Sequence, residues 1–114
     1  MKICYEGIGQ WAATFEAEGV SEGAAVKLGG NGKVTACTAG DHFCGVALCL
    51  SHDGSGCTVQ MGGMVQLGYT GTAPSVGYAK LSADGNGGVK ADSNGREHLL
   101  VEVDTTGKTV TMVL

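Results

Sequence analysis

The sequence contains a diverged internal repeat, in which the second half of the chain repeats the first. Five positions recur at one constant offset: Val34, Ala36, Gly40, Val46 and Leu48 return as Val89, Ala91, Gly95, Val101 and Val103. After a small indel, Cys57-Thr58-Val59-Gln60-Met61 aligns with Lys108-Thr109-Val110-Thr111-Met112. The shared positions are turn glycines and alternating apolar residues, which are the residues that determine a fold. The repeat therefore predicts a structure built from two like halves.

Short strands joined by tight turns account for this pattern. Asn31-Gly32 and Asn86-Gly87 precede the two repeat blocks, and Asn-Gly supplies the positive φ angles of a tight hairpin. Apolar and polar residues alternate along most of the segments between the turns. The predicted fold is all-β, a small barrel or sandwich of short antiparallel strands and hairpins made of two quasi-repeated halves, without a convincing helix.

The first 20 residues lie outside the repeat and carry half of the large aromatic side chains, Tyr5, Trp11 and Phe15. We predict an N-terminal arm or edge strand over residues 1–20, which packs on the barrel, lies on a partner, or does both. A chain of 114 residues suffices for one ordinary domain. Residues 21–114 are predicted to form a single β domain, with repeat halves at about 24–69 and 76–114.

Two strands have patterns with consequences for packing. Phe43 to Leu50 is apolar throughout, so we expect this strand to be covered on both faces, with another subunit as the second cover. Its apolar residues are the predicted core of a trimer. Near the C-terminus, residues 97–104 alternate, which predicts that Leu99, Val101 and Val103 point inward.

Charge and hydropathy argue against two classes of partner. The net charge is −4, the only arginine is Arg96, and the lysines are scattered, whereas phosphate backbones are bound by clustered basic residues. No apolar run approaches the roughly 20 residues of a membrane span, and no signal peptide is predicted. The sequence predicts neither a nucleic-acid nor a membrane partner.

The cysteines and histidines do not form a recognisable reactive or metal-binding motif. The five cysteines are odd in number and include no Cys-x-x-Cys pair, which favours reduced, buried thiols in a cytosolic setting. His42, His52 and His98 lack the paired spacing of a zinc site. A nucleophilic pair of Cys44 or Cys49 with a histidine depends on tertiary geometry and stays open as a minor alternative. We therefore predict no enzyme, no catalytic residues, no metal and no cofactor.

With the strand plan in place, the chain resembles the small capsid decoration (cement) proteins of tailed phages and prophages, of the DUF2190 type. It is similar in size and plan to lambda-like head decoration proteins. The resemblance covers about residues 20–114. It rests on the run from Gly23 to Leu50, in which Gly45-Val46-Ala47-Leu48 is the sharpest element, followed by Thr58 to Met61, Val76 to Leu81 and the final strand.

The resemblance implies a structural virion protein, made in the cytoplasm of a bacterial host, that binds the outside of an expanded phage head as a homotrimer and stabilises it. The implied partner is the major capsid protein. Aromatic side chains dominate interface energies, and our candidate anchors on the shell are Tyr5, Ile8, Trp11 and Phe15. The candidate interaction residues in the trimer core are Phe43, Val46, Leu48 and Leu50. The alternatives are a small β binding module, for example one that stacks glycans on Trp11 and Tyr78, or a Cys/His enzyme.

Overall fold

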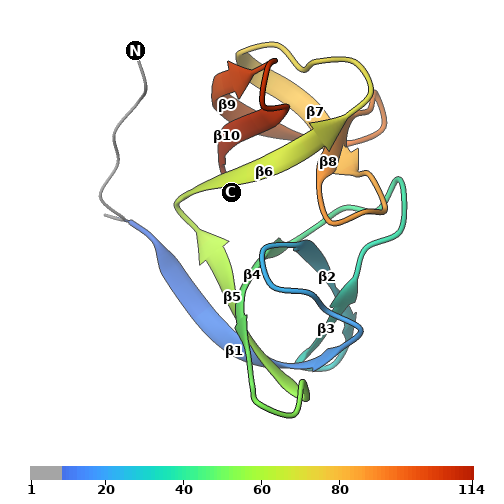
Figure 1. The fold of residues 1–114 in the computed structure, drawn as a ribbon, viewed down its shortest axis with the longest axis vertical. Helices are drawn as coiled ribbons and strands as arrows, with labels where there is room; N and C mark the ends of the chain where they lie inside the picture. Colours follow the sequence, from blue (N-terminus) through green and yellow to red (C-terminus); the bar gives the residue numbers. More distant parts are fainter. Residues whose placement is uncertain (1–8) are drawn as a thin grey trace.

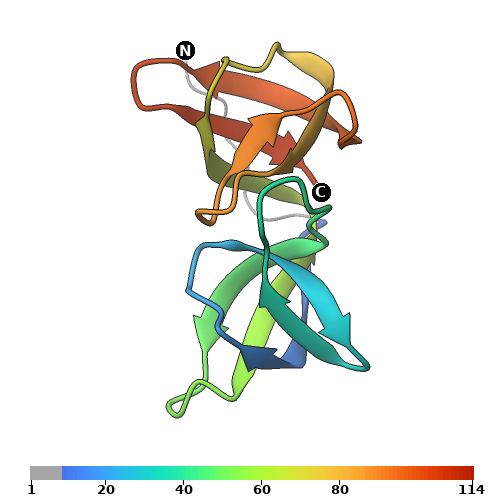
Figure 2. The same cartoon turned by 90° about the vertical axis from the view of Figure 1, so that its right-hand side faces the viewer.

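The computed structural model describes residues 9–114, which form two small closed β barrels stacked along the long axis of the molecule (Figures 1 and 2). The described residues contain no helix, so the predicted all-β barrel is confirmed. The first barrel contains β1 (Trp11–Glu18), β2 (Ala25–Gly30), β3 (Lys33–Ala36), β4 (Gly45–Leu50) and β5 (Gly56–Gly62). The second contains β6 (Met64–Thr70), β7 (Gly77–Ala83), β8 (Val89–Ala91), β9 (Arg96–Asp104) and β10 (Thr109–Val113).

The two barrels have the same strand order. Around the first barrel the order is β1-β3-β2-β4-β5, and the second repeats it as β6-β8-β7-β9-β10. Each barrel has one parallel pair, β1 with β3 and β6 with β8, and its other neighbours are antiparallel. The sheets are thus mixed rather than purely antiparallel, because the first strand of each half returns to close the barrel beside the third.

The boundaries of the halves differ from those expected. Residues 11–18, placed by sequence in an arm or edge strand, form β1, which is hydrogen-bonded to β3 on one side and β5 on the other. Residues 64–69, placed in the first half, belong to β6 of the second barrel. The halves therefore meet at Gly63, between β5 and β6. The repeat alignment missed β1 and β6 because their residues are too different to align.

Strand pairing also refines the repeat. Val34 pairs with Ala17 and Val89 pairs with Tyr69, which supports the alignment of Val34 with Val89. Strands β4 and β9 each have a register shift against the following strand, directly after Ala47 in β4 and directly after Leu100 in β9. Superposing the two shifts makes Ala47 and Leu100 counterparts. The alignment of Val46 with Val101 is therefore off by two residues. A slip of two by itself keeps every side chain on the same face of a strand, so the misalignment does not change which residues of β9 point inward.

The first half of strand β4, Gly45 to Ala47, is covered on both faces by its own chain, whereas Leu48 and Cys49 are exposed. Ala47 belongs to the core of the first barrel together with Val26 and Val59, whereas Val46 on the opposite face belongs to the core cluster of the second barrel. The two-sided apolar pattern of this strand was read as a sign of another subunit. The position of β4 between the two barrels accounts for the pattern at Gly45 to Ala47, and a subunit contact at the exposed half of the strand stays a prediction.

A β-bulge changes the inward residues of β9. The register shift opposite Thr111 and Met112 leaves His98 and Leu100 buried, and Val103 packs on the core only after the bulge. Leu99 and Val101 are half-buried on the outer side. The expectation that Leu99 and Val101 point inward was therefore wrong, because alternation in sequence does not reveal an extra residue in a strand.

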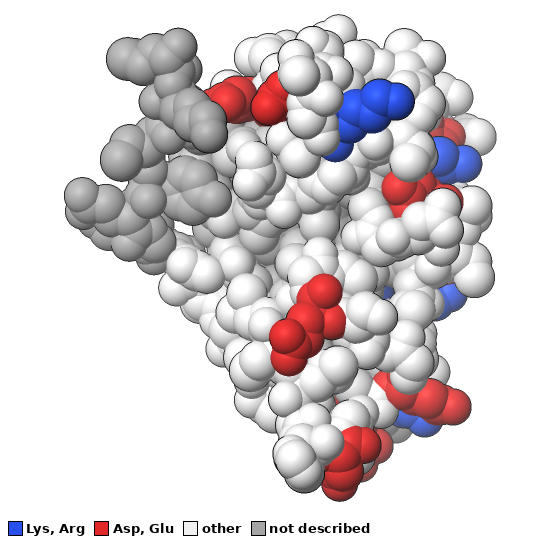
Figure 3. All heavy atoms as spheres, viewed as in Figure 1, with Lys and Arg blue, Asp and Glu red and all other residues white. Residues whose placement is uncertain are grey.

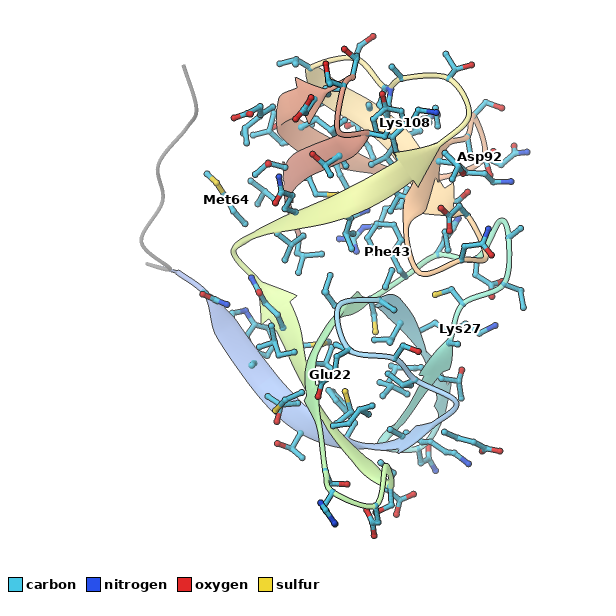
Figure 4. The ribbon with its side chains drawn as sticks, viewed as in Figure 1. Glu22, Lys27, Phe43, Met64, Asp92 and Lys108 are labelled. Carbon is cyan, nitrogen blue, oxygen red and sulfur yellow. The ribbon has the colours of Figure 1, made fainter. Side chains whose placement is uncertain are left out.

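The connection between β3 and β4, residues 37–44, joins the two barrels. Gly40 N donates to Ala83 O, and Ala83 N donates to Asp41 O, each at 2.9 Å. His42 Nε2 lies 3.1 Å from the carbonyl oxygen of Asn94, and the Phe43 ring stacks on His98 with centroids 5.0 Å apart. Figure 4 shows Phe43 between the barrels. These contacts fix the second barrel against the first.

Candidate functional site

Large apolar side chains that lie on the surface are the first candidates for a binding site, because burying them against a partner is favourable. Among residues 9–114, five such side chains are exposed: Trp11 (57 %), Leu28 (55 %), Leu48 (42 %), Val76 (65 %) and Tyr78 (72 %). They lie on both barrels. Leu48 lies in a groove between the barrels with Trp11 beside it, and Tyr78 lies in an apolar row on the second barrel, whereas Leu28 and Val76 lie outside both features.

The groove between the barrels has a volume of about 300 Å³ and contains Leu48. Its lining comes from both barrels and consists of Gln10, Gly23, Val46, Ala47, Leu48, Gln60, Met64, Val65 and Gln66. Two of the predicted interaction residues, Val46 and Leu48, therefore meet here. Trp11 follows Gln10, and its indole lies against Gly62, where any Cβ would collide with it.

Gln60 forms the floor of this groove and fixes the crossover between the barrels. Its buried Nε2 donates to the carbonyl oxygens of Gly62 and Met64, both at 3.0 Å, and its Oε1 accepts from Gln10 Nε2 at 2.9 Å. Gly63 lies between these carbonyls with φ +89°, and a Cβ there would be 2.9 Å from the Cα of Gln10. The crossover thus needs a glycine and a buried amide side by side.

The outer apolar row consists of Met64, Val113, Leu99 and Tyr78, one residue from each of β6, β10, β9 and β7. Val113 pairs with both Met64 and Leu99, and Leu99 pairs with Tyr78, so the four side chains are direct cross-strand neighbours on the outside of the second barrel. Tyr78 is exposed and the other three are half-buried. Figure 4 shows Met64 projecting from the start of β6. The row is continuous with the groove through Met64.

The remaining predicted interaction residues lie in other places. Tyr5 and Ile8 are outside the described residues. Phe15 and Leu50 are half-buried and pack on the core of the first barrel, and Phe43 is buried at the junction of the barrels. The structure places Val46 and Leu48 in the groove beside Gln10, the residue before Trp11. The other described candidates, Phe15, Phe43 and Leu50, pack on the cores of the fold.

Sequence reasoning missed Met64, Leu99 and Val113 as surface residues. Leu99 was assigned to the interior because the bulge in β9 is invisible in the sequence. Met64 and Val113 alternate with inward residues, so the sequence predicts that both face outward. The row itself depends on pairings between strands far apart in the chain, which the sequence does not reveal.

The cysteine environments suit structural thiols. Burial raises the pKa of Cys37 to about 11 and also raises the pKa of Cys44 and Cys57, which keeps these groups protonated and weakly nucleophilic at neutral pH. Cys49 on β4 is exposed, and the four cysteines among the described residues are unpaired. Within the same residues, no group of three or more His, Cys, Asp or Glu side chains is arranged to hold a metal ion.

Charges on the face that holds the groove are mainly acidic. Figure 3 shows acidic side chains on both barrels and an uncharged stretch between them.

On the connection between β3 and β4, Asp41 accepts hydrogen bonds from Lys27 at 2.6 Å and from the backbone and hydroxyl of Thr38, each at 2.8 Å. These bonds lower the pKa of Asp41 to about 2, so it is ionised at neutral pH and holds the connection in place.

Comparison with protein-family models and with curated proteins finds no match for this chain. The described part of the chain contains no helix with the length and apolar character needed to cross a bilayer.

Proposed function

We propose that this protein is a structural component of a phage or prophage particle, which binds the outside of the expanded head as a trimer, contacts the major capsid protein and stabilises the shell. The observation that supports this function best is the continuous apolar surface formed by the groove and the outer apolar row. The resemblance to decoration proteins agrees with it in size, strand plan and the run around Gly45 to Leu48.

The stabilisation follows from mass action. A protein that binds the expanded head, and not its precursor, shifts the equilibrium toward the expanded state by its differential affinity. Many copies on a symmetric lattice, each held by neighbouring copies, add avidity without requiring tight single contacts. Rigid closed barrels suit this role, because little conformational entropy is lost when they bind.

We assign the contact with the shell to Trp11 and Leu48, beside the groove. Replacing Trp11 with Ala or Leu48 with Ser should weaken binding to expanded heads about tenfold or more, because truncating a central aromatic or aliphatic anchor removes most of an interface's affinity. Val76→Ser is the control, since Val76 is an even more exposed apolar residue but lies outside the groove, on the second barrel. Binding is measured by co-sedimentation with heads of the encoding phage or prophage that lack this protein.

The segment before β1 is tested by deleting residues 1–8. A longer deletion through residue 20 would remove β1 and open the first barrel, so its loss of binding would carry no information. The short deletion should leave the circular dichroism spectrum unchanged and reduce head binding. Equal binding of the intact protein to expanded and unexpanded heads, or none to either, would contradict the proposed function.

One observation favours a second candidate, a small glycan-binding module. Tyr78 lies beside a shallow depression of about 450 Å³ whose lining includes Pro74, Ser75, Lys80 and Asp92. An exposed ring next to polar groups is a suitable platform for a sugar. Saturable binding on a glycan array that is lost in Tyr78→Ala would favour this module over the capsid protein.

A further inference from the structure

The backbone groups of β6 alternate between two directions. Tyr69 N donates to Lys108 O across the ladder with β10. Hydrogen-bonded pairs recur at every second residue of an antiparallel ladder, so the odd-numbered residues of β6 point their N–H and C=O groups at β10 and the even-numbered residues point theirs away from it. The hydrogen bond from Gln60 Nε2 to the carbonyl oxygen of Met64 agrees with this direction.

The groups that point away from β10 have a strand partner over only part of β6. Strand β8 pairs with Tyr69 and Thr70, and no strand among residues 9–114 pairs with Met64 to Gly68 on that side. We call this stretch the free edge. Both backbone groups of Gln66 lie at its centre. A free edge of a sheet is a place where an extended peptide can add as a further strand.

A cleft between the barrels follows the free edge. The groove described above borders Met64 to Gln66, and a second hollow of about 400 Å³ borders Gly68 to Thr70. The two hollows meet at Gly23 of the first barrel, where an added Cβ would have no heavy atom within 4 Å. Figure 1 shows β6 as the strand of the second barrel that faces the first. We call the two hollows together the β6 cleft, and an extended chain can lie in it alongside the free edge.

The two ends of the β6 cleft differ in character. In the groove, Leu48 of the first barrel presents an apolar side chain. In the second hollow the charged lining residues are Glu22 and Asp84, one from each barrel, and neither hollow is lined by Lys or Arg. Asp84 is fixed because its Oδ1 accepts from the backbone N–H groups of Asn86 at 2.7 Å and Gly88 at 3.1 Å. A segment with an apolar residue at one end and a basic residue at the other is complementary to this lining.

We propose that the β6 cleft binds an extended segment of a partner protein as an added strand. The backbone of the segment pairs with Gln66, an apolar side chain packs on Leu48, and a lysine or arginine lies between Glu22 and Asp84. Backbone pairing gives affinity for an extended chain, and the two ends of the cleft give selectivity. This inference rests on the proposed function only for the identity of the partner, in which case the segment belongs to the major capsid protein.

Strand β1 provides an internal control. Its stretch Trp11 to Phe15 also lacks a strand partner on one side, but it lines neither hollow of the β6 cleft. Ala17 N donates to Ser55 O in the ladder with β5, so the even-numbered residues of β1 point their backbone groups away from β5. The amide of Thr14 is therefore free in the same way as that of Gln66, outside the cleft.

Amide hydrogen exchange of the full chain tests the pairing directly. The probes are two synthetic peptides, acetyl-Leu-Thr-Val-Thr-Lys-amide and acetyl-Lys-Thr-Val-Thr-Leu-amide, which cover both strand directions. At least one of them should slow exchange of the Gln66 amide about tenfold or more, because this N–H gains a hydrogen-bond acceptor. The exchange rate of the Thr14 amide should stay the same.

A proline variant removes the donor at the free edge. Gln66→Pro deletes the N–H that points into the cleft without deleting a hydrogen bond to β10, and it should weaken peptide binding about tenfold or more. Thr14→Pro is the matched control, since it makes the same change on β1, and it should bind the peptide as the wild type does. Circular dichroism checks the fold of both variants, and NMR titration measures binding.

A charge reversal tests the acidic end of the cleft and does not alter the backbone. Glu22→Lys should weaken binding of the lysine peptide about tenfold and should favour the same peptide with glutamate in place of lysine. Glu97→Lys, at an exposed position of β9, is the control and should keep the preference for lysine. Should Gln66→Pro fail to fold, this reversal and the exchange of the wild type still decide the outcome.

Several results would overturn the proposal. They are unchanged exchange of the Gln66 amide with both peptides at millimolar concentration, equal slowing at Thr14, or equal binding of the lysine and glutamate peptides by the wild type. These assays use purified protein without heads. Peptide binding by a protein that binds no heads would contradict the proposed function alone, whereas head binding that the peptides do not compete for would contradict the β6 cleft alone.

Discussion

His98 is a buried ionisable group at the junction of the barrels. Its side chain is 4 % exposed, its ring stacks on Phe43 at an interplanar angle of 11°, and its Nε2 has no hydrogen-bond partner among the described residues. Burial lowers the pKa of His98 and the nearby Arg96 lowers it further, while the hydrogen bond with the backbone of Val113 acts in the opposite direction. The folded state therefore favours the neutral form of His98 over the protonated form.

Acid should for this reason destabilise the protein through His98. The pKa in the folded state lies below that of the unfolded chain, so the contribution of His98 to stability is complete above about pH 6.5 and is lost as the pH falls below it. We expect the Tm of the wild type to fall between pH 7 and pH 5, and that of His98→Phe, which keeps the stacking, to change less. His52→Gln, an exposed control, should follow the wild type in calorimetry; identical curves for all three proteins would contradict this role.

The thiols should differ in reactivity according to burial. In native protein, iodoacetamide should modify Cys49 rapidly and leave Cys37 and Cys57 unmodified, since the last two are buried and their pKa values are raised. Peptide mass spectrometry after a timed reaction gives the order of modification, and the denatured chain provides the full-reaction control. Fast native modification of Cys37 would show that the junction opens readily.

Individual strands were largely predictable from the sequence, because turn residues and alternation are local. Alternation in Met64 to Tyr69 predicts Val65, Leu67 and Tyr69 on one face, and these three residues are buried in β6. Turn residues on either side of Val89 to Ala91 predict a short strand, which is β8. The sequence predicts nearly the observed length of β9. It does not predict which residues of β9 point inward, because the bulge arises in the pairing with β10.

The crossover between β5 and β6 depends on Gln60. Replacing Gln60 with Leu keeps the volume but leaves the carbonyl oxygens of Gly62 and Met64 without this donor, which should lower the free energy of unfolding by about 1–3 kcal/mol. Gln66→Leu is the matched control at an exposed position of β6 and should change stability by less than about 0.5 kcal/mol. Urea denaturation measures both variants; equal effects would indicate that the buried amide does not hold the crossover.

At the scale of the whole molecule, the sequence predicted two like halves but not how they close. Alternation indicates which face of a strand is buried, not which strand lies beside it, so the long-range pairs of β1 with β5 and β6 with β10 could not be derived. The same limit hid the candidate site. The outer apolar row exists only because Tyr78, Leu99, Val113 and Met64 are brought together from four strands, whereas Leu48 was found because it lies in one conspicuous apolar run.

Closure of both sheets determines what kind of forces a partner can use. Every strand of each barrel pairs with a neighbour on both sides over part of its length, so only short stretches, such as Trp11–Phe15 of β1 and Met64–Gly68 of β6, lack a strand partner on one side. Recognition along the rest of the barrel walls comes from side chains, and at the candidate site these are mainly apolar. Apolar attraction weakens on cooling and changes little in moderate salt. Cooling, rather than a higher ionic strength, should therefore release this protein from a partner bound at that site.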